Sequence, residues 1–295
     1  MSLSVVISAY NEEKRIEDCL LSASFADEII VVNNSSTDKT LEIVSRYTSK
    51  IFTKPNNIML NINKNFGFSK ASGDWLLSLD ADERISPSLA QEIKSVIKND
   101  SVVNGYWIPR KNIIFGKWIK YTGWYPDYQL RLIRTGKGKF PEKHVHEMIK
   151  VEGKAEKLIN PMIHYNYESI YQFLRKLEIY VESESKNLID KGYKLKVEDA
   201  INFPFKEFLS RFFAREGYRD GLHGLVLSLL MAFYHLAVFV RIWEKEGFEK
   251  KNVDTLSLLH KESKVAKKEF RYWVRNEKIK RIKNPFKKIL FKLLR

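Results

Sequence analysis

Cysteine is almost absent from this chain of 295 residues, which contains Cys19 alone. A single cysteine excludes an intrachain disulfide and a zinc cluster built on cysteines, and it is typical of a protein kept in a reducing cytosol. A secretory signal pattern is also missing, because a strand-like run already occupies Leu3 to Ile7. Internal repeats and low-complexity linkers are absent too. The length then favours one large α/β domain with an appendage.

Acidic residues are scarce near the carboxyl terminus, where basic residues are abundant. The net charge is +15, and the last 35 residues hold fourteen Lys and Arg against three Glu, which is +11. Such a tail suits either a nucleic acid or an anionic membrane surface. The chain lacks an RNP-type aromatic motif and a helix-turn-helix pattern. We therefore expect no nucleic acid partner and favour the membrane.

The first hundred residues alternate apolar, strand-like runs with helical patterns. This alternation predicts parallel βαβ units, in which ligands bind at the carboxyl ends of the strands. The predicted strands are Leu3–Ile7, Glu28–Val32, Lys50–Thr53 and Trp75–Leu79. Three helices are predicted between them. The first begins at Asn11–Glu13 and has Ile16, Leu20 and Ala23 on one face, the second has Leu41, Val44 and Tyr47 in register, and the third covers 61–71.

Two carboxylates follow the apolar strand that ends at Leu79, in the segment Leu79-Asp80-Ala81-Asp82-Glu83. Strand alternation predicts that Asp80 and Asp82 point the same way. Two convergent carboxylates suit Mg²⁺ or Mn²⁺, above all an ion that also holds substrate phosphates. The plainer interpretation is a strand end followed by a solvated turn. The polar clusters at the ends of the neighbouring strands favour a site.

The residue pattern changes twice in the rest of the chain. Residues 105–167 are aromatic and punctuated by Gly and Pro, which indicates β structure, and 171–188 has a helical pattern. The run 222–240 is nearly all apolar, and its His and Ser residues favour a buried or interfacial helix over a membrane span. The segment 285–295 alternates an apolar stripe with Lys and Arg, which is typical of an in-plane interfacial helix; a solvated basic helix is the alternative.

The order of motifs resembles the inverting family 2 glycosyltransferases of GT-A fold, an α/β fold with a Rossmann-like, mostly parallel sheet. The motifs from 145 onward resemble the lipopolysaccharide core β-1,4-glucosyltransferase branch. The resemblance covers roughly residues 1–245. The segments that carry it are VISAYNEE (6–13), VVNNSSTD (31–38), KNFG (64–67), GDWLLSLDADE (73–83), VHE (145–147), IHY (163–165) and RDGLHG (219–224).

The resemblance implies three regions and a donor site. Residues 1–100 would be the half that binds a nucleotide-sugar, which the analogy with the family predicts to be UDP-linked. Residues 101–170 would be the acceptor-binding and catalytic half, and 171–295 a helical, membrane-associating region. Asn33 stands where the family usually has an Asp that reads the base, which leaves the nucleotide open. The implied donor-binding residues are Ala9, Tyr10, Asn11, Glu12, Asn33, Lys64, Asn65, Asp80, Ala81 and Arg131.

The resemblance also implies a metal centre and a catalytic base. Asp80, Asp82 and His164 match the positions that hold Mg²⁺ or Mn²⁺, which would neutralise the leaving diphosphate. Glu147 matches the base that accepts a proton from the attacking hydroxyl, and Asp127 is the competing candidate. Arg131 and Arg134 suit phosphate contacts, and Trp118, Trp124 and Tyr125 suit either sugar stacking or core packing.

The leading hypothesis is a metal-dependent glycosyltransferase at the cytoplasmic face of the cell membrane. Its acceptor would be a lipid-linked saccharide such as lipopolysaccharide core. A sugar nucleotidyltransferase is the alternative enzyme, and a basic nucleic-acid- or membrane-binding protein without catalysis is the alternative of another class.

Overall fold

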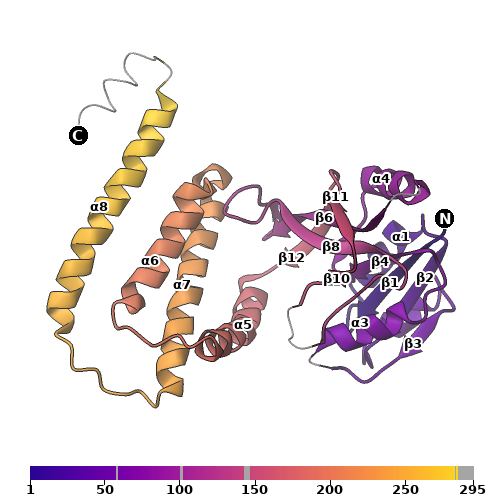
Figure 1. Cartoon of the computed structure of the whole chain (residues 1–295), viewed down its shortest axis with the longest axis horizontal. Coiled ribbons are helices and arrows are strands. Elements are labelled where there is room, and N and C mark those ends of the chain that lie inside the picture. Colours follow the sequence, from indigo (N-terminus) through magenta and orange to yellow (C-terminus); the bar gives the residue numbers. More distant parts are fainter. Residues whose placement is uncertain (58, 100–101, 143–146, 283, 285–295) are drawn as a thin grey trace. The chain divides into compact units, whose positions relative to one another are not determined.

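The first hundred residues form the alternating strands and helices that the sequence predicts (Figure 1). The computed structural model describes residues 1–57, 59–99, 102–142, 147–282 and 284. The elements of this part are β1 (Leu3–Ala9), α1 (Ile16–Ala23), β2 (Glu28–Asn33), α2 (Thr40–Val44), β3 (Ile51–Thr53), α3 (Leu60–Phe68), β4 (Trp75–Asp80), β5 (Glu83–Arg84) and α4 (Pro87–Lys98).

The sheet is parallel through β3, β2, β1 and β4, in that order. The central strands are apolar on both faces because helices cover both sides of such a sheet. Val5, Ile7 and Leu77 are accordingly fully buried. Helix α3 lies directly on the sheet at Gly67, where an added Cβ would stand 2.5 Å from Val6 Cγ1. Only a glycine allows this close approach.

Antiparallel strands continue the same sheet. Strand β8 pairs antiparallel with β4 and with β6, and the order proceeds through β12 to the two-residue strand β5. The predicted change to β structure after residue 105 is therefore confirmed. These strands are β6 (Val103–Ile114), β7 (Lys117–Trp118), β8 (Asp127–Arg134), β9 (Gly138–Lys139), β10 (Lys150–Val151), β11 (Lys154–Lys157) and β12 (Met162–Tyr167).

Several predicted helix limits were wrong. Helix α1 begins at Ile16 and not at Asn11, whose φ of 53° lies in the left-handed region that a right-handed helix excludes. Helix α2 has five residues and ends before Tyr47, and α3 ends at Phe68 and not at residue 71. The predicted inner face of α1 is correct, because Ile16, Leu20 and Ala23 are all buried.

The chain divides into two compact units. The first comprises 1–114 and 125–166, and the second comprises 115–124 and 167–295. The insert 115–124 belongs to the second unit because the buried carboxylate of Asp220 accepts hydrogen bonds from the Tyr121 backbone N–H at 2.8 Å and the Thr122 hydroxyl at 3.3 Å.

The second unit is helical. Its elements are α5 (Ile170–Asp190), α6 (Asp199–Leu209), the π turn η1 (Ser210–Ala214), the 3₁₀ turn η2 (Gly217–Asp220), α7 (Leu222–Lys245) and α8 (Thr255–Arg281). Helix α7 has the length and mean hydropathy, 2.1 over 18 residues, that a membrane span needs, but core helices share these properties. The amphipathic segment predicted at 285–295 lies outside the described residues.

Candidate active site

The carboxyl ends of the parallel strands bring the predicted donor-binding residues to one edge of the sheet. Ala9 pairs with Asn33, Asn33 pairs with Thr53, and Ser8 pairs with Asp80. The strand ends that follow the predicted motifs are therefore neighbours (Figure 1). This is the edge at which open α/β sheets bind ligands.

The loops after β1 and β2 lock together. The side-chain oxygen of Asn11 accepts from the Thr37 N–H at 2.8 Å, and the backbone N–H of Asn11 donates to the Ser36 hydroxyl at 3.1 Å. The Glu12 N–H donates to the Thr40 hydroxyl at 2.8 Å. Asn11 thus shapes two loops instead of capping α1, and Tyr10 beside it is 42% exposed.

The buried side chain of Asn33 holds the turn after β2. Its Oδ1 accepts from the Ser36 N–H at 3.0 Å, and its Nδ2 donates to the Thr53 hydroxyl at 3.4 Å. The amide thus links β2 to β3 through Thr53, a link that an Asp could also form, because the Thr53 hydroxyl can donate to a carboxylate.

Asp80 stands between two cations at the end of β4. Lys64 Nζ lies 2.5 Å from Oδ1, and Arg131 Nη2 lies 2.6 Å from Oδ2. Burial disfavours the charged carboxylate, but the charges of Arg131 and Lys64 outweigh burial and hold the pKa of Asp80 well below its usual range. Both carboxylate oxygens are therefore engaged by protein cations.

Glu83 is a buried carboxylate that the sequence interpretation did not single out. It is fully buried, and its Oε1 lies 3.0 Å from Arg131 and 3.6 Å from Arg110. Its Oε2 accepts from the Asp80 N–H at 2.9 Å. Glu83 holds Arg131 against Asp80 and fixes the backbone at the start of the Asp-x-Asp turn. The sequence offers no local signal for this role, because the two arginines come from β6 and β8.

Asp127 is saturated with donors. Arg110 approaches Oδ2 at 2.6 Å, the Asn112 amide donates to Oδ2 at 3.2 Å, and the Gln129 amide donates to Oδ1 at 3.0 Å. Burial raises the pKa of Asp127, but Arg110 and the amide donors lower it by more, so the pKa of this carboxyl is below its ordinary value. A carboxylate held in this way is a weak proton acceptor.

Asp82 lies beyond the end of β4, in a turn, so the strand alternation that we used to orient it does not apply. Its Oδ2 lies 3.6 Å from Nε2 of the buried His164, and its backbone carbonyl accepts from the Tyr165 N–H at 2.9 Å. Asp82 thus faces β12, whereas the carboxylate of Asp80 faces Lys64 and Arg131.

Asn112 determines which nitrogen of the His164 imidazole carries the proton. Its amide nitrogen donates to Asp127, so its Oδ1, 2.7 Å from His164 Nδ1, accepts the proton that Nδ1 carries. In the neutral imidazole, Nε2 then presents a lone pair to the Asp82 carboxylate. Two acceptors this close repel unless a cation or a proton lies between them. Asp82 and His164 therefore fit a shared divalent cation.

The described residues contain no group of three His, Cys, Asp or Glu side chains close enough to hold a metal ion together. The predicted trio divides into Asp82 with His164 on one side and Asp80 with its two cations on the other. Any further ligands to a cation would come from substrate phosphates or water, as is usual for Mg²⁺.

Other predicted residues serve to hold the fold. The Asn65 amide bonds to both the N–H and the carbonyl of Phe140, and the backbone of buried Ala81 accepts from Arg84. Arg134 lies opposite Trp75 at the start of β4, which is the wrong end of the strand for contact with the site.

The remaining candidates are three aromatic residues and Glu147. Trp118 and Trp124 belong to the second unit, where Trp124 meets the ring of Tyr167 edge-on at 6.2 Å. Tyr125 belongs to the first unit. Glu147 is half-buried there, and the preceding Val-His of its motif lies outside the described residues.

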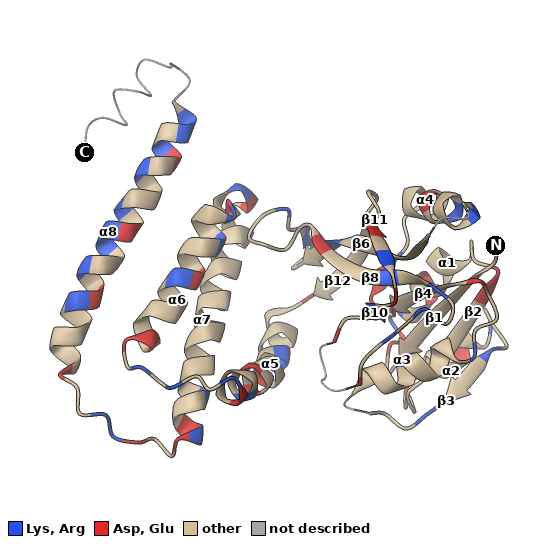
Figure 2. Ribbon diagram, in the orientation of Figure 1, with Lys and Arg blue, Asp and Glu red and all other residues tan. Residues whose placement is uncertain are grey.

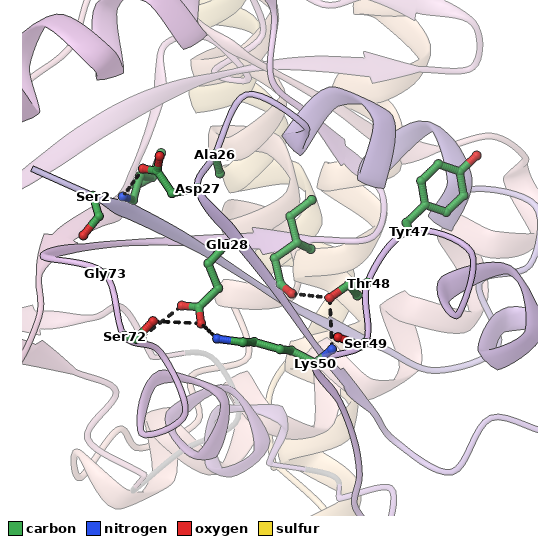
Figure 3. A pocket seen from close by; sticks show the side chains of 12 residues that line it. Ser2, Ala26, Asp27, Glu28, Tyr47, Thr48, Ser49, Lys50, Ser72 and Gly73 are labelled. Atoms are coloured by element: carbon green, nitrogen blue, oxygen red, sulfur yellow. Dashed lines mark hydrogen bonds and ion pairs between the residues drawn. The ribbon is translucent and has the colours of Figure 1, made fainter.

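A hollow of about 520 Å³ lies at the opposite edge of the sheet, around the amino ends of β1 and β2 (Figure 3). Glu28 lines it and bonds to Lys50 and to the Ser72 hydroxyl at 3.0 Å. Burial disfavours the charge of Glu28, but bonds from Lys50, Ser4 and Ser72 lower its pKa to about 2. These partners tie β2 to the start of β3 and the loop before β4, which is a structural role.

The family model described as "Glycosyl transferase family 2" matches residues 4–151, just over half of the chain. The chain belongs to this family: it has the GT-A fold, and it is a glycosyltransferase that uses a nucleotide-sugar.

Similar proteins extend beyond the matched domain. Lipopolysaccharide core biosynthesis glycosyltransferase LpsC of Rhizobium meliloti (strain 1021) is 25% identical over 268 residues, covering 86% of this chain and 97% of that protein. An uncharacterized glycosyltransferase of Rickettsia felis is 29% identical over 252 residues, covering 81% and 88%. The crystal structure of S. aureus TarS 1–349 with UDP-GlcNAc covers 86% of this chain and 95% of its own, with 18% identity and a TM-score of 0.45.

Proposed function

We propose that this enzyme moves a sugar from a nucleotide-diphospho-sugar, UDP-linked, to a lipid-linked saccharide acceptor, with inversion and with Mg²⁺ or Mn²⁺. One observation supports the metal. Asn112 binds Nδ1 of His164, so that the lone pair of Nε2 faces Asp82 Oδ2 at 3.6 Å. Asp82 and His164 would hold the cation, which supplies positive charge to the departing diphosphate. Asp80 would instead position Lys64 and Arg131.

The protein's own cations would share the work of binding the donor. Lys64 is 9% exposed and Arg131 is 6% exposed, and ion pairs with Asp80 hold both at the end of β4. Fixed charges in a largely dry site stabilise developing negative charge without reorganising. The loops that carry Ala9–Glu12 and Asn33 would cradle the nucleoside. The half formed by 1–100 would thus bind the donor, and 101–170 would bind the acceptor and supply the base.

The contacts of Asp127 argue against it as that base, and Glu147 is our candidate. A general base must present a free lone pair and have a pKa near the working pH. Asp127 has donors on both oxygens and a lowered pKa. We assign Asp127 the role of orienting Asn112, and through it His164.

The acceptor assignment rests on the similarity to LpsC, whose name places it in lipopolysaccharide core biosynthesis. A lipid-linked acceptor requires an enzyme that works at a membrane. The basic residues of 261–295, of which those within α8 are blue in Figure 2, would attract the anionic cytoplasmic leaflet by about 1 kcal/mol each. The enzyme would be cytoplasmic and peripheral at the inner face of the membrane.

The test is a thermal-shift screen of nucleotide-sugars with and without Mn²⁺, followed by analysis of the released product. A donor raises the apparent stability by mass action, so the correct one produces the largest shift. We expect a Mn²⁺-dependent shift and release of a nucleoside diphosphate. Release of pyrophosphate in a parallel assay with a nucleoside triphosphate and a sugar 1-phosphate would instead establish the nucleotidyltransferase alternative and contradict the proposal.

A further inference from the structure

Helix α7 has two faces of different character. The run Leu222–Val240 contains no Asp, Glu, Lys or Arg. One face is buried in the second unit, where Val238 and Ile242 pack with Val181 of α5. The other face carries Leu222, Leu229, Phe233, Val240 and Trp243, which are 73%, 53%, 50%, 44% and 36% exposed. Steps of seven, four, seven and three residues place these side chains along one stripe of a helix.

This stripe is too large to be an ordinary exposed surface. A helix rises 1.5 Å per residue, so Leu222 to Val240 extends about 27 Å. Contiguous apolar patches of such length mark interaction sites. The possible occupants are a lipid surface and a second copy of this chain.

The charge of α8 favours lipid. Of its acidic residues, Glu262 and Glu277 are only 7% and 6% exposed, and Glu269 is half-buried. The exposed charged positions of α8 are instead basic; they include Lys261, Lys264, Lys267, Lys268 and Arg271 (Figure 2). A second copy carries the same net charge of +15, so the two copies would repel each other, whereas an anionic bilayer attracts this charge.

The charged contacts of α7 argue against a span. Glu207 of α6 forms an ion pair with Arg211 and lies 3.7 Å from His235 of α7. Arg241 near the end of α7 pairs with Glu182 of α5 at 2.7 Å. A helix with charged protein partners on one side and apolar side chains on the other is typical of one that lies in the plane of the membrane interface. The apolar side of such a helix is buried about 5–10 Å deep in the lipid.

We propose that α7 lies in the plane of an anionic membrane interface, with the stripe Leu222, Leu229, Phe233, Val240 and Trp243 inserted among the lipids. The inference rests on the membrane location given under the proposed function. It adds the surface that enters the lipid, which differs from the basic tail that attracts the leaflet.

Spin labels at three points of the stripe test this arrangement. Cys19 is fully buried and its burial raises the pKa of its thiol, so an introduced cysteine labels selectively. Leu222→Cys, Phe233→Cys and Val240→Cys would each carry a nitroxide, with Ile159→Cys, an 82% exposed apolar position of the first unit, as the control. The full chain is bound to vesicles of 30% phosphatidylglycerol in phosphatidylcholine, and collisions with oxygen and with a nickel chelate give the label depth.

We expect the three stripe labels to lie at one shallow depth and the Ile159 label to stay in water. Depths that increase steadily from one end of α7 to the other would show a span and overturn the proposal. Labels shielded from lipid, with concentration-dependent dipolar broadening, would show a second copy and also overturn it. No donor or acceptor is present, so this outcome is independent of sugar transfer.

A flotation assay with the same vesicles checks the energetics. Phe233→Glu should lower vesicle binding at least tenfold, whereas Ile159→Glu, which adds the same charge on the first unit, should leave it within twofold. Retention of the donor-induced thermal shift in Phe233→Glu shows that the fold persists. Equal binding of both variants would refute the insertion of the stripe.

Discussion

Asn112 shows how one buried amide can set the chemistry of a site. It satisfies Asp127 with its nitrogen and His164 with its oxygen, and so it fixes the imidazole tautomer that meets Asp82. Asp80, Asp82 and His164 could be found from the sequence because they lie in local motifs. Asn112, Glu83 and Arg110 could not, because their roles depend on partners from distant strands.

Glu83 gives the residue-scale prediction. Glu83→Gln keeps the shape of the side chain but leaves Arg131 and Arg110 without their shared buried carboxylate. Breaking a buried ion pair in this way costs about 3–5 kcal/mol, which urea denaturation would measure as a loss of unfolding free energy. The control Glu156→Gln removes an exposed partner of Lys154 and should cost less than about 1 kcal/mol. Equal losses would contradict the role of Glu83.

At the scale of elements, the strands were predictable and the helix limits were less so. Continuous apolar runs locate β1, β2 and β4, because a strand covered on both faces has no polar side. The predicted start of α1 was wrong because Asn is a common helix-capping residue, whereas Asn11 adopts a left-handed conformation and binds the loop after β2. The decisive bond comes from Thr37, which no local pattern at Asn11 reveals.

Acid should loosen the junction of β2, β3 and β4 through Glu28. The pKa of Glu28 is lowered from 4.5 to about 2, so its stabilising effect is complete above pH 4.5 and disappears as the pH falls toward 2. We expect the difference in unfolding free energy between wild type and Glu28→Gln to shrink over this interval. Urea titrations at several pH values would measure it, and a difference independent of pH would contradict the account.

At the scale of the whole molecule, the sequence predicted a basic, helical carboxyl-terminal region but not that 115–124 would belong to it. The insert 115–124 lies within a β-rich stretch of sequence, yet it belongs to the helical unit because Asp220 binds its backbone. Such a long-range anchor is invisible in the sequence of the insert.

The distribution of charge, and not its total, should control membrane binding. Replacing Lys264, Lys267, Lys268 and Arg271 by Gln should weaken binding to anionic vesicles by up to about 4 kcal/mol at low salt, at about 1 kcal/mol per residue. The control replaces four exposed lysines of the first unit, Lys98, Lys137, Lys139 and Lys154, by Gln. Flotation would compare the two variants, and similar losses would refute a specific role of α8.

The central claim is that a divalent cation joins Asp82 and His164 to the donor diphosphate. Calorimetry of the nucleoside diphosphate selected by the screen, with and without Mn²⁺, tests this most directly in wild type and Asp82→Asn. We predict that Mn²⁺ tightens binding at least tenfold in wild type and has little effect in the folded Asp82→Asn variant. Binding that ignores Mn²⁺ in wild type, or a full Mn²⁺ effect in Asp82→Asn, would contradict the account.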